Sequence, residues 1–520
     1  MLRKYLYFVC KIVLFFCVYT NASATDLSKE KKIYQDYKFP VVKDSNPTQK
    51  ACRSDSIRCM IDGKTLGVFE GMMQEHYMET HFDSPNINLY NDVADGVLSI
   101  LHKKVDFFIM HEALLNELKQ QHPSLISMFE GFNYFDIAFG INKNNRQLTQ
   151  EIDDFLKAFN KNDTISKINS KWIRNFDTAK IPDIDLSSNK KLLRVGTSAT
   201  SMPYTFVSEG KVQGIDIEIL TEFCKYAGYR MEILQMPFGS LLLSLKANKI
   251  DVFANCLFVT GDKKQVIDYT LPYSRQNFAF VYNRDRLNAA NDKLGIIESS
   301  KQSFYNNLIK EDRYKQILDG LCRTSLISVS SIFLGTILGI IICFMNMHNS
   351  HLLKVLASSY ISLIRGTPIL VLLMINFYVV FTQMPISSTI IAIITFAMNL
   401  GAYCSEMFRS SILSIDKGQK EAGLAMGFTN IQTFIFIIAP QVVKIVLPIF
   451  KGECISLIKM TSIVGYVAVQ DLTKVSDIIR SRTFDAFFPL LVSAILYFLL
   501  AFIFSKLLDV LCSLRFNKYI

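Results

Sequence analysis

The chain has 520 residues, of which 50% are hydrophobic and only 20% are charged, and its mean hydropathy is +0.24. This composition excludes a disordered protein and argues against a wholly soluble one, and the length allows about three domains of roughly 150 residues. The net charge of +10 comes from Lys and Arg spread along the chain. No basic stripe with interleaved aromatics stands out, so we expect no nucleic-acid partner and explain the charge by lysines beside membrane spans. Residues 25–320 have the composition of a soluble protein, whereas 321–520 contain long stretches without charge.

The first 24 residues have the pattern of a secretory signal peptide. A basic start at 1–4 precedes an apolar run at 12–18, and the small residues 22–24 suit cleavage. An uncleaved anchor is the alternative, because Lys11 interrupts the apolar run. In either case we expect the following region to be exported, beginning with a linker at 25–59.

Eleven cysteines are present, and most lie in the signal peptide or in the membrane half. The exported part keeps Cys52, Cys59, Cys224 and Cys256. In an oxidising compartment Cys52 and Cys59 can form a disulfide, and two free thiols are the equal alternative. No Cys/His spacing indicates a metal site.

The uncharged stretches predict five membrane spans. Residues 324–347 suffice for one, and 366–405 is too long for a single helix across about 30 Å of hydrocarbon, so a tight turn at 382–385 should join two spans there. Residues 431–458 and 486–505 supply the last two. With an exported N-terminus the C-terminus lies inside. The positive-inside rule agrees, because the inner loops then carry Lys354, Arg365, Arg409, Lys417 and Lys420.

The loop between the third and fourth predicted spans carries the most specific motif. Its small residues favour a short amphipathic helix that a partner protein can approach closely, and Gly427 should end that helix. The spacing resembles the EAA loop of ABC importer permeases, although Gly423 replaces the family's Ala and Ala439 replaces its Leu. An ordinary interfacial helix is the alternative. The resemblance implies an ATPase-coupling loop made of Gly418, Glu421, Ala422, Gly423, Gly427 and Pro440.

Three flanking motifs narrow this resemblance. They are Arg-Gly-Thr-Pro at 365–368, the segment 406–419, and Leu-Ile-Lys-Met-Thr-Ser-Ile at 457–463. Over 321–515 the chain resembles the polar amino-acid permeases of the histidine and glutamine type. The resemblance implies a homodimer or heterodimer docked on ATP-binding subunits. Because the chain lacks a Gly-x4-Gly-Lys-Ser/Thr phosphate loop, we expect it to bind no cofactor itself, with ATP and Mg held by a separate ATPase chain.

Two charged residues, Glu453 and Lys459, lie in or beside the fourth predicted span. Intramembrane charge is costly and usually faces a pathway, so both are candidates for the translocation path. A structural ion pair near a helix end is the equal alternative.

The exported half resembles family 3 periplasmic solute-binding proteins in a rearranged order. Residues 190–285 resemble lobe one, from the strand near Val195 to Ile267-Asp268, and 60–180 resemble lobe two with its terminal helices, which end at Trp172. A connector at 286–320 follows, and its residues 294–305 repeat the pattern of 66–77. If the halves rebuild one permuted domain, the terminal helices should pack on lobe one. A decayed pair of half-domains is the alternative.

The candidate ligand residues depart from the pattern of that family. The resemblance assigns the carboxylate-binding arginine to the position of Lys263, beside the retained Thr260, and the ammonium-binding acid to the position of His111, with Glu112 next to it. A stacking aromatic is replaced by Ser201. Lysine can hold a carboxylate only as a point charge, without the bidentate fork of arginine.

These observations predict a mixed fold, in which an exported α/β two-lobed binding region precedes an all-α membrane domain of five transmembrane helices. We expect a multi-pass subunit of an ABC importer in a bacterial inner membrane, with its N-terminal half periplasmic, that moves a polar amino acid or related small solute. A membrane-bound solute sensor without transport is the alternative, and the fifteen residues after Ser505 argue against it. A ligand-gated channel is a third alternative, but the EAA-like loop has no role in a channel.

Overall fold

The computed structural model describes residues 63–516, apart from 71–73, 76–77, 79–85, 91–92, 129–133, 176–178, 183–185, 187–188, 190, 261–265, 285–300, 302, 383, 385 and 486. Gly63–Ile520 forms one compact unit. The predicted signal peptide and linker, Cys52, Cys59, Lys263 and most of the repeat at 294–305 lie outside the described residues.

A six-stranded sheet forms lobe two, in the order β2-β1-β3-β14-β4 with β5 paired to β14. Strand β1 pairs in parallel with β2 and β3, whereas β14 runs antiparallel to its neighbours. Helices α5 (Val93–Leu101) and α6 (Glu112–Gln121) pack on this sheet. The strands are β1 (Thr65–Phe69), β2 (Asn86–Tyr90), β3 (Phe107–His111), β4 (Leu125–Met128), β5 (Tyr134–Ile137) and β14 (Ser274–Asn283).

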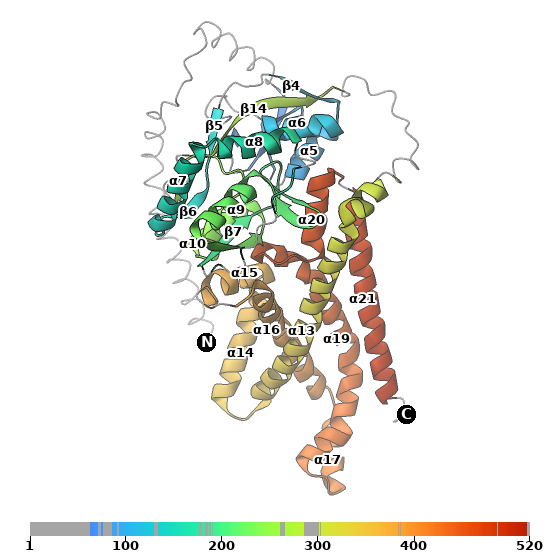
Figure 1. Ribbon diagram of the computed structural model, residues 1–520. Helices are drawn as coiled ribbons and strands as arrows, with labels where there is room; N and C mark the ends of the chain where they lie inside the picture. Colours follow the sequence, from blue (N-terminus) through green and yellow to red (C-terminus); the bar gives the residue numbers. More distant parts are fainter. Residues whose placement is uncertain are drawn as a thin grey trace. The chain divides into compact units, whose positions relative to one another are not determined.

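A five-stranded sheet forms lobe one, in the order β11-β7-β12-β6-β13. Its strands are β6 (Gly140–Asn142), β7 (Lys191–Thr197), β11 (Tyr229–Gln235), β12 (Val252–Phe253) and β13 (Ile267–Tyr269). A small sheet beside it contains β8 (Thr200–Ser201), β9 (Thr205–Ser208) and β10 (Lys211–Gln213). Figure 1 shows the helices of this lobe, α7 (Arg146–Asn160), α8 (Thr164–Asn175), α9 (Ile215–Ala227) and α10 (Phe238–Lys246).

Each lobe contains strands from both halves of the α/β region. Strand β6 comes from the first half and pairs with β12 and β13 of lobe one. Strand β14 comes from the second half and pairs with β3, β4 and β5 of lobe two. The chain therefore crosses between lobes twice, from β5 to β6 and from β13 to β14, so the two halves build one two-lobed domain.

The terminal helices pack on lobe one, as the permuted arrangement predicts. Trp172 of α8 is fully buried, its ring lies edge-on to Phe206 at 5.8 Å, and its Nε1 donates to Glu218 of α9 at 2.5 Å. Lys171 forms an ion pair with the same carboxylate at 2.8 Å. The prediction that the helices ending at Trp172 pack on lobe one, the lobe of Val195, is confirmed.

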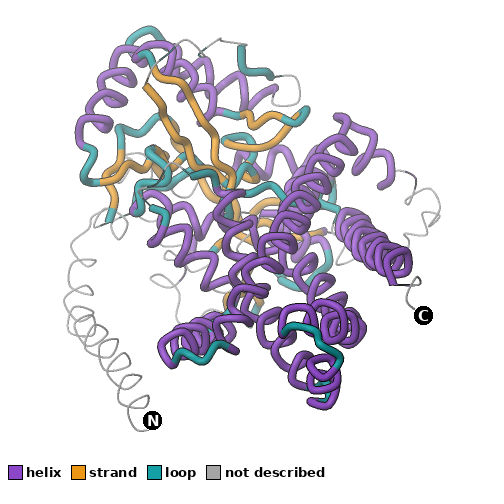
Figure 2. Tube along the Cα trace, turned by 90° about the horizontal axis from the view of Figure 1, so that it is seen from below, coloured by secondary structure: helices purple, strands orange, loops and turns teal. Residues whose placement is uncertain are grey.

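In the C-terminal half, every secondary-structure element of the described residues from Tyr305 onward is a helix, and short turns join them; Figure 2 draws the helices in purple and the strands of the α/β region in orange. Short turns of helix, η2 (Tyr305–Ile309) and η3 (Lys310–Asp312), come before the long helices. The long helices are α13 (Arg313–Met347), α14 (His351–Gly366), α16 (Ser388–Leu413), α19 (Ala439–Met460) and α21 (Phe487–Phe516). Between them lie α15 (Ile369–Ile375), η4 (Asn376–Val380), α17 (Lys417–Ala425), α18 (Asn430–Thr433), η5 (Phe434–Ile438), η6 (Thr461–Val467) and α20 (Leu472–Thr483).

Four helical stretches are long and apolar enough to span a membrane, and a fifth span exists if the bent pair α14 and α15–η4 counts as one. The pair bends by 108° where Pro368 follows Thr367, because proline lacks an N–H and disfavours helical geometry in the residue before it. Where the charges of Lys354 and Arg365 predicted a loop, residues 351–366 form helix α14. The predicted turn at 382–385 falls between η4 and α16.

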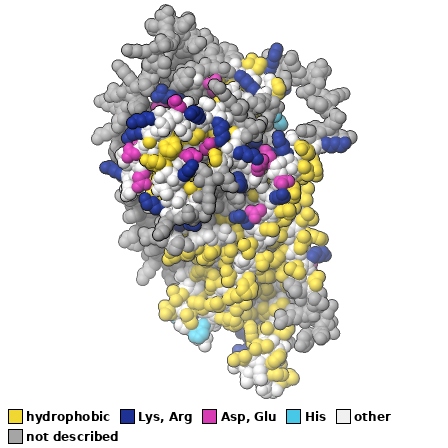
Figure 3. All heavy atoms as spheres, viewed as in Figure 1, with side chains coloured by type: hydrophobic (Ala, Val, Ile, Leu, Met, Phe, Trp, Pro, Cys, Tyr) yellow, Lys and Arg dark blue, Asp and Glu magenta, His cyan; other side chains and the backbone are white. Residues whose placement is uncertain are grey.

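Exposed apolar side chains cover the outside of the helical half. Phe333, Leu363, Val379 and Phe498 are each at least 65% exposed, and Figure 3 shows hydrophobic side chains gathered over the helices, with charged side chains over the α/β region. Inside, α13 packs closely on α16: a Cβ added at Gly339 would lie 2.6 Å from Cβ of Cys404. Small residues at helix contacts and apolar residues facing outward are the pattern expected in lipid.

Candidate functional site

A cavity of about 340 Å³ lies where lobe one, lobe two and the membrane half meet. Lobe two contributes aromatic and acidic side chains, lobe one contributes small polar ones, and helix α20 with η6 contributes both charges. Among the residues lining the cavity are Glu70, Tyr90, Asp95, Ser198, Ser201, Phe238, Asn255, Tyr466, Asp471, Lys474, Asp477 and Arg480.

The lobe-one wall of this cavity is a fixed polar surface centred on Asn255. The Oδ1 atom of Asn255 accepts from the backbone N–H of Ser198 at 2.8 Å and from its hydroxyl at 2.7 Å. Its Nδ2 donates to Ser201 Oγ at 3.2 Å. The flanking residues Ala199 and Cys256 both have positive φ, at 55° and 50°, which is uncommon for non-glycine residues and typical of constrained sites.

A buried carboxyl group, that of Asp216, is hydrogen-bonded to the backbone next to Asn255. Asp216 is fully buried, accepts from the backbone N–H of Cys256 at 2.9 Å, and lies 2.7 Å from the hydroxyl of Tyr273. Burial without a positive partner disfavours the carboxylate and raises the pKa of Asp216 to about 7. Asp216 thus holds the loop of Asn255 and Cys256 in place.

Of the predicted ligand residues, Ser201 lines the cavity. Thr260 has a buried hydroxyl with no hydrogen-bond partner among the described residues. Glu112 begins α6 and accepts from Asn277 Nδ2 at 3.2 Å. Lys263 lies outside the described residues.

His111 has a structural position at the start of α6. Its Nδ1 accepts from the backbone N–H of Leu114 at 3.2 Å, and its ring lies edge-on to Tyr204 at 6.1 Å. Burial lowers the pKa of His111 to about 4, because the protonated ring would be desolvated. A neutral imidazole with Nδ1 engaged caps the helix and does not replace a carboxylate.

Sequence reasoning missed the charged residues that α20 brings to the cavity, above all Arg480, whose partner is Asp95. A signal was present, because 471–485 holds six charged residues between two apolar stretches. The partner of Arg480 lies 385 residues earlier in the chain, so no local pattern connects them.

The EAA-like segment forms a short exposed helix, α17, followed by a turn. Asp416 caps its start by accepting from the N–H of Gly418 at 2.6 Å, and Gly427 follows its end with φ of +87°. The N–H of Phe428 donates to the carbonyl of Gly423 at 3.1 Å, which is the hydrogen bonding of a glycine-terminated helix. Pro440 lies in the first turn of α19.

Gly423 is the buried residue of α17, whereas Gly418, Glu421 and Ala422 are exposed. A Cβ at Gly423 would lie 2.6 Å from Thr433 Cγ2. Glycine at this position therefore lets α17 pack against α18 and η5. The side chain of Met426 is 75% exposed, so the helix presents both a carboxylate and an apolar surface to a partner.

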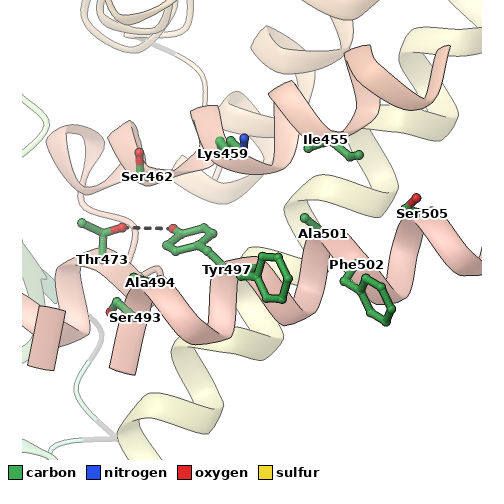
Figure 4. A pocket seen from close by; sticks show the side chains of 11 residues that line it. Ile455, Lys459, Ser462, Thr473, Ser493, Ala494, Tyr497, Ala501, Phe502 and Ser505 are labelled. Carbon is green, nitrogen blue, oxygen red and sulfur yellow. Dashed lines mark hydrogen bonds between the residues drawn. The ribbon is translucent and has the colours of Figure 1, made fainter. Parts of the chain in front are cut away.

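A second cavity, of about 690 Å³, lies between α19 and α21 (Figure 4). Lys459 lines it together with the hydroxyl groups of Ser462 and Tyr497, and Tyr497 lies 3.0 Å from Thr473 Oγ1. Glu453 is half-buried on α19 and is not among the residues lining this cavity. Among the ion pairs of the described residues, none joins Glu453 to Lys459.

A two-lobed α/β region joined to a bundle of apolar helices defines a membrane component of a solute-transport system, and comparisons with known proteins agree. The model of the bacterial extracellular solute-binding proteins, family 3, matches residues 193–421. The model of the binding-protein-dependent transport system inner membrane component matches 331–513. The chain belongs to this family of inner membrane components and carries a segment of the solute-binding family, so the resemblance to both families is confirmed, the second from residue 193 onward.

Two relatives come from Bacillus subtilis. The probable amino-acid ABC transporter permease protein YckA is 34% identical over 209 residues, which are 39% of this chain and 92% of that protein. The L-cystine transport system permease protein TcyB is 33% identical over 219 residues, covering 41% of this chain and 92% of that protein. A crystal structure of an amino acid ABC transporter with histidines shares 31% identity, with a TM-score of 0.36 and coverage of 42% of this chain and 98% of that one.

Proposed function

We propose that this chain is the membrane subunit of an ABC importer for a polar amino acid, with its own solute-binding region in front of the permease. The observation that carries the proposal is the exposed helix α17, on which Glu421, Ala422 and Gly423 precede the turn at Gly427. The small buried Gly423 lets α17 pack against its neighbours, while the exposed face of α17 can dock into a groove of another subunit. Relatives named for amino acids and for L-cystine support the class of solute.

We place five spans in an inner membrane, with the binding region on the outer side. The segments of the helical half that we assign to the outer side contact the lobes. Lys249 Nζ of lobe one donates to the carbonyl of Phe381 at 2.7 Å, and Arg480 of α20 pairs with Asp95 of lobe two at 2.7 Å. Counting α14 and α15–η4 as one bent span puts α17 on the inner side. The inner segments carry Arg409, Lys417 and Lys420, as the positive-inside rule expects. The basic residues Arg480 and Arg482 of the outer helix α20 instead contact the lobes, at Asp95 and Met202.

A separate ATPase chain binds ATP and Mg and docks on α17, and a second permease copy completes the transporter. Exposed apolar and charged residues on the same short helix support this docking, since Leu424 and Met426 lie next to Glu421 and are 41% and 75% exposed. Lys459, in the cavity between α19 and α21, is assigned to the translocation path, with Glu453 as a second charged residue on α19.

Charge reversal on α17 tests the proposal. In cells that contain the chain and its ATPase, Glu421→Lys should abolish uptake of radiolabelled amino acids while the protein still inserts, because the loop lies outside the hydrocarbon. Glu421→Gln, which keeps the size of the side chain, is the matched variant and should retain part of the uptake. Normal uptake by Glu421→Lys would overturn the assignment, and ligand-dependent signalling without any uptake would favour a sensor instead.

A further inference from the structure

Helix α20 of the membrane half lies against both lobes of the binding region. Ile478 is 5% exposed and packs in one hydrophobic cluster with Ala199 and Val207 of lobe one. Two residues later, Arg480 Nη1 pairs with Asp95 Oδ1 of lobe two at 2.7 Å. The helix therefore forms a third wall of the interlobe cavity.

The guanidinium of Arg480 keeps hydrogen-bonding capacity at this wall. Its side chain is 15% exposed, its contact with Asp477 Oδ1 is long at 3.4 Å, and its buried Nε has no hydrogen-bond partner among the described residues. A guanidinium has five N–H donors, and leaving one buried and unsatisfied costs free energy. Asp95 occupies Nη1 and Nε is buried, so the donor open to a solute carboxylate is Nη2, whose contact with Asp477 is long.

The acids of the cavity have different roles. Asp471 is occupied as the cap of α20, since it accepts from the N–H groups of Thr473 and Lys474 at 3.1 and 3.0 Å and lies 3.0 Å from the hydroxyl of Tyr497. Asp95 and Glu70 belong to lobe two and line the cavity across from lobe one. Asp95 pairs with Arg480, so an acidic and a basic group stand together at the cavity wall, where the two ends of a zwitterion each meet an opposite charge.

The remaining walls suit a small polar solute. Ser198, Ser201 and Asn255 present hydroxyl and amide groups that their mutual hydrogen bonds hold in place. Tyr90 and Phe238 add aromatic surface from opposite lobes. The volume of about 340 Å³ lies at the lower end of the range for small-molecule sites, which is about 300–1,000 Å³.

We propose that α20 completes the solute site, with Arg480 binding the carboxylate of an amino acid whose ammonium group lies toward Asp95 and Glu70. This deepens the proposed function and rests on it for the class of solute. The carboxylate-binding guanidinium then belongs to the permease, and lobe one carries only Lys263 at the position where the resemblance expects arginine. A solute so bound touches both lobes and the permease at once, so movement of α20 directly changes its contacts.

Equilibrium binding tests this without the ATPase. The purified full chain in lipid nanodiscs is titrated with a panel of radiolabelled L-amino acids, alongside Arg480→Met, Arg480→Lys and Arg194→Met. Arg194 is the matched control, because its ion pair with Asp251 at 2.7 Å is also partly buried but lies outside the residues lining the cavity. Arg480→Met should weaken binding of the preferred amino acid by on the order of 10- to 100-fold, and Arg480→Lys by less. Arg194→Met should bind as the wild type.

A carboxylate-blocked ligand separates direct contact from a structural effect. The amide of the preferred amino acid should bind the wild type more weakly than the free acid does, whereas Arg480→Met should bind both alike, because the contact is already lost. Equal discrimination by the wild type and Arg480→Met would overturn the proposal, as would unchanged affinity in Arg480→Met or no amino-acid binding by the wild type.

Different outcomes would overturn the proposed site and the proposed transport function. Arg480-dependent binding without uptake in cells would overturn the transport function and leave the site standing. Uptake together with unchanged binding by Arg480→Met would overturn the site and leave the function standing.

Discussion

At the scale of single residues, the interior of the binding region depends on groups kept neutral by burial. Asp216 sits among Tyr273, Tyr204 and Cys256, and burial raises its pKa from the usual 3.8 to about 7. His111, near Tyr204, has its pKa lowered by burial to about 4. Both groups are uncharged at mildly acidic pH, so neither adds an unpaired charge to the core.

The raised pKa of Asp216 gives stability a defined pH dependence. The folded state holds its proton up to about pH 7, whereas the unfolded chain releases it near pH 4. The contribution is therefore present below about pH 4 and lost as the pH rises to about 7. In Asp216→Asn, the amide can donate to Tyr273 and accept from Cys256, so the variant should lack this loss. The difference in unfolding midpoint between the wild type and the variant should change steadily from pH 4 to 7.

Trp172 makes this measurable in the full chain, because it is the single tryptophan and is buried in lobe one. Its fluorescence reports unfolding of the binding region and not of the membrane helices. His111 affects stability in the same pH window with the opposite sign, since its contribution is lost as the pH falls from about 6.5 toward 4. It is present in both proteins, so the difference isolates Asp216. Parallel curves would show that Asp216 is ionised in the folded state.

At the scale of elements, the packing of helix α17 depends on Gly423, a residue that departs from the EAA pattern. A Cβ at position 423 would lie 2.6 Å from Thr433 Cγ2 and 2.9 Å from Ile437 Cδ1. Distances under 3 Å require movement, which outweighs the gain of about 1 kcal/mol that alanine brings to a helix. The sequence places glycine in this segment where the resemblance expects alanine, and the neighbouring Thr433 gives the reason.

Gly423→Ala should therefore loosen α17 from α18 and η5. In inside-out vesicles, trypsin should cut at the exposed Lys417 and Lys420 faster in this variant than in the wild type. Thr433→Ser removes the clashing methyl group, so the double variant should return toward the wild-type rate, with Thr433→Ser alone as the control. Unchanged cleavage in Gly423→Ala would show that the helix is not seated on Thr433.

The elements that sequence predicted well are those with local signals. The glycine-terminated helix at 417–425 and the break between η4 and α16 follow from spacing and composition. The terminal helices ending near Trp172 follow from the resemblance to the solute-binding family. Helix α14 was missed because Lys354 and Arg365 interrupt its apolar residues, although both lie near the ends of that helix. The role of α20 was missed because its partners, Asp95 and Ala199, are contacts between distant parts of the chain.

At the scale of the whole molecule, the rearranged order of the two halves still gives one two-lobed domain. Pairing of β14 with lobe two and of β6 with lobe one requires long-range contacts that no sequence pattern specifies. What the sequence supplied was the resemblance of each half to its own lobe. The cavity between the lobes, closed by a helix of the permease, follows only when these parts are assembled.

The five-span arrangement makes a topological prediction. Reporter fusions after Ile415 and after Ile520 should both read cytoplasmic, because three spans precede the first and five precede the second. A fusion in the segment 468–471, before α20, should read external, because four spans precede it. An external signal at either of the first two sites would exclude the arrangement.

The central claim is that this chain binds its solute and transports it with no separate binding protein, and reconstituted transport tests it directly. Proteoliposomes containing the chain and its ATPase, with ATP inside, should accumulate the preferred radiolabelled amino acid when no soluble binding protein is added. Uptake should stop without ATP and in Glu421→Lys, and Arg480→Met should require a higher amino-acid concentration. Uptake that appears only after a soluble binding protein is supplied, or no uptake at all, would contradict the account.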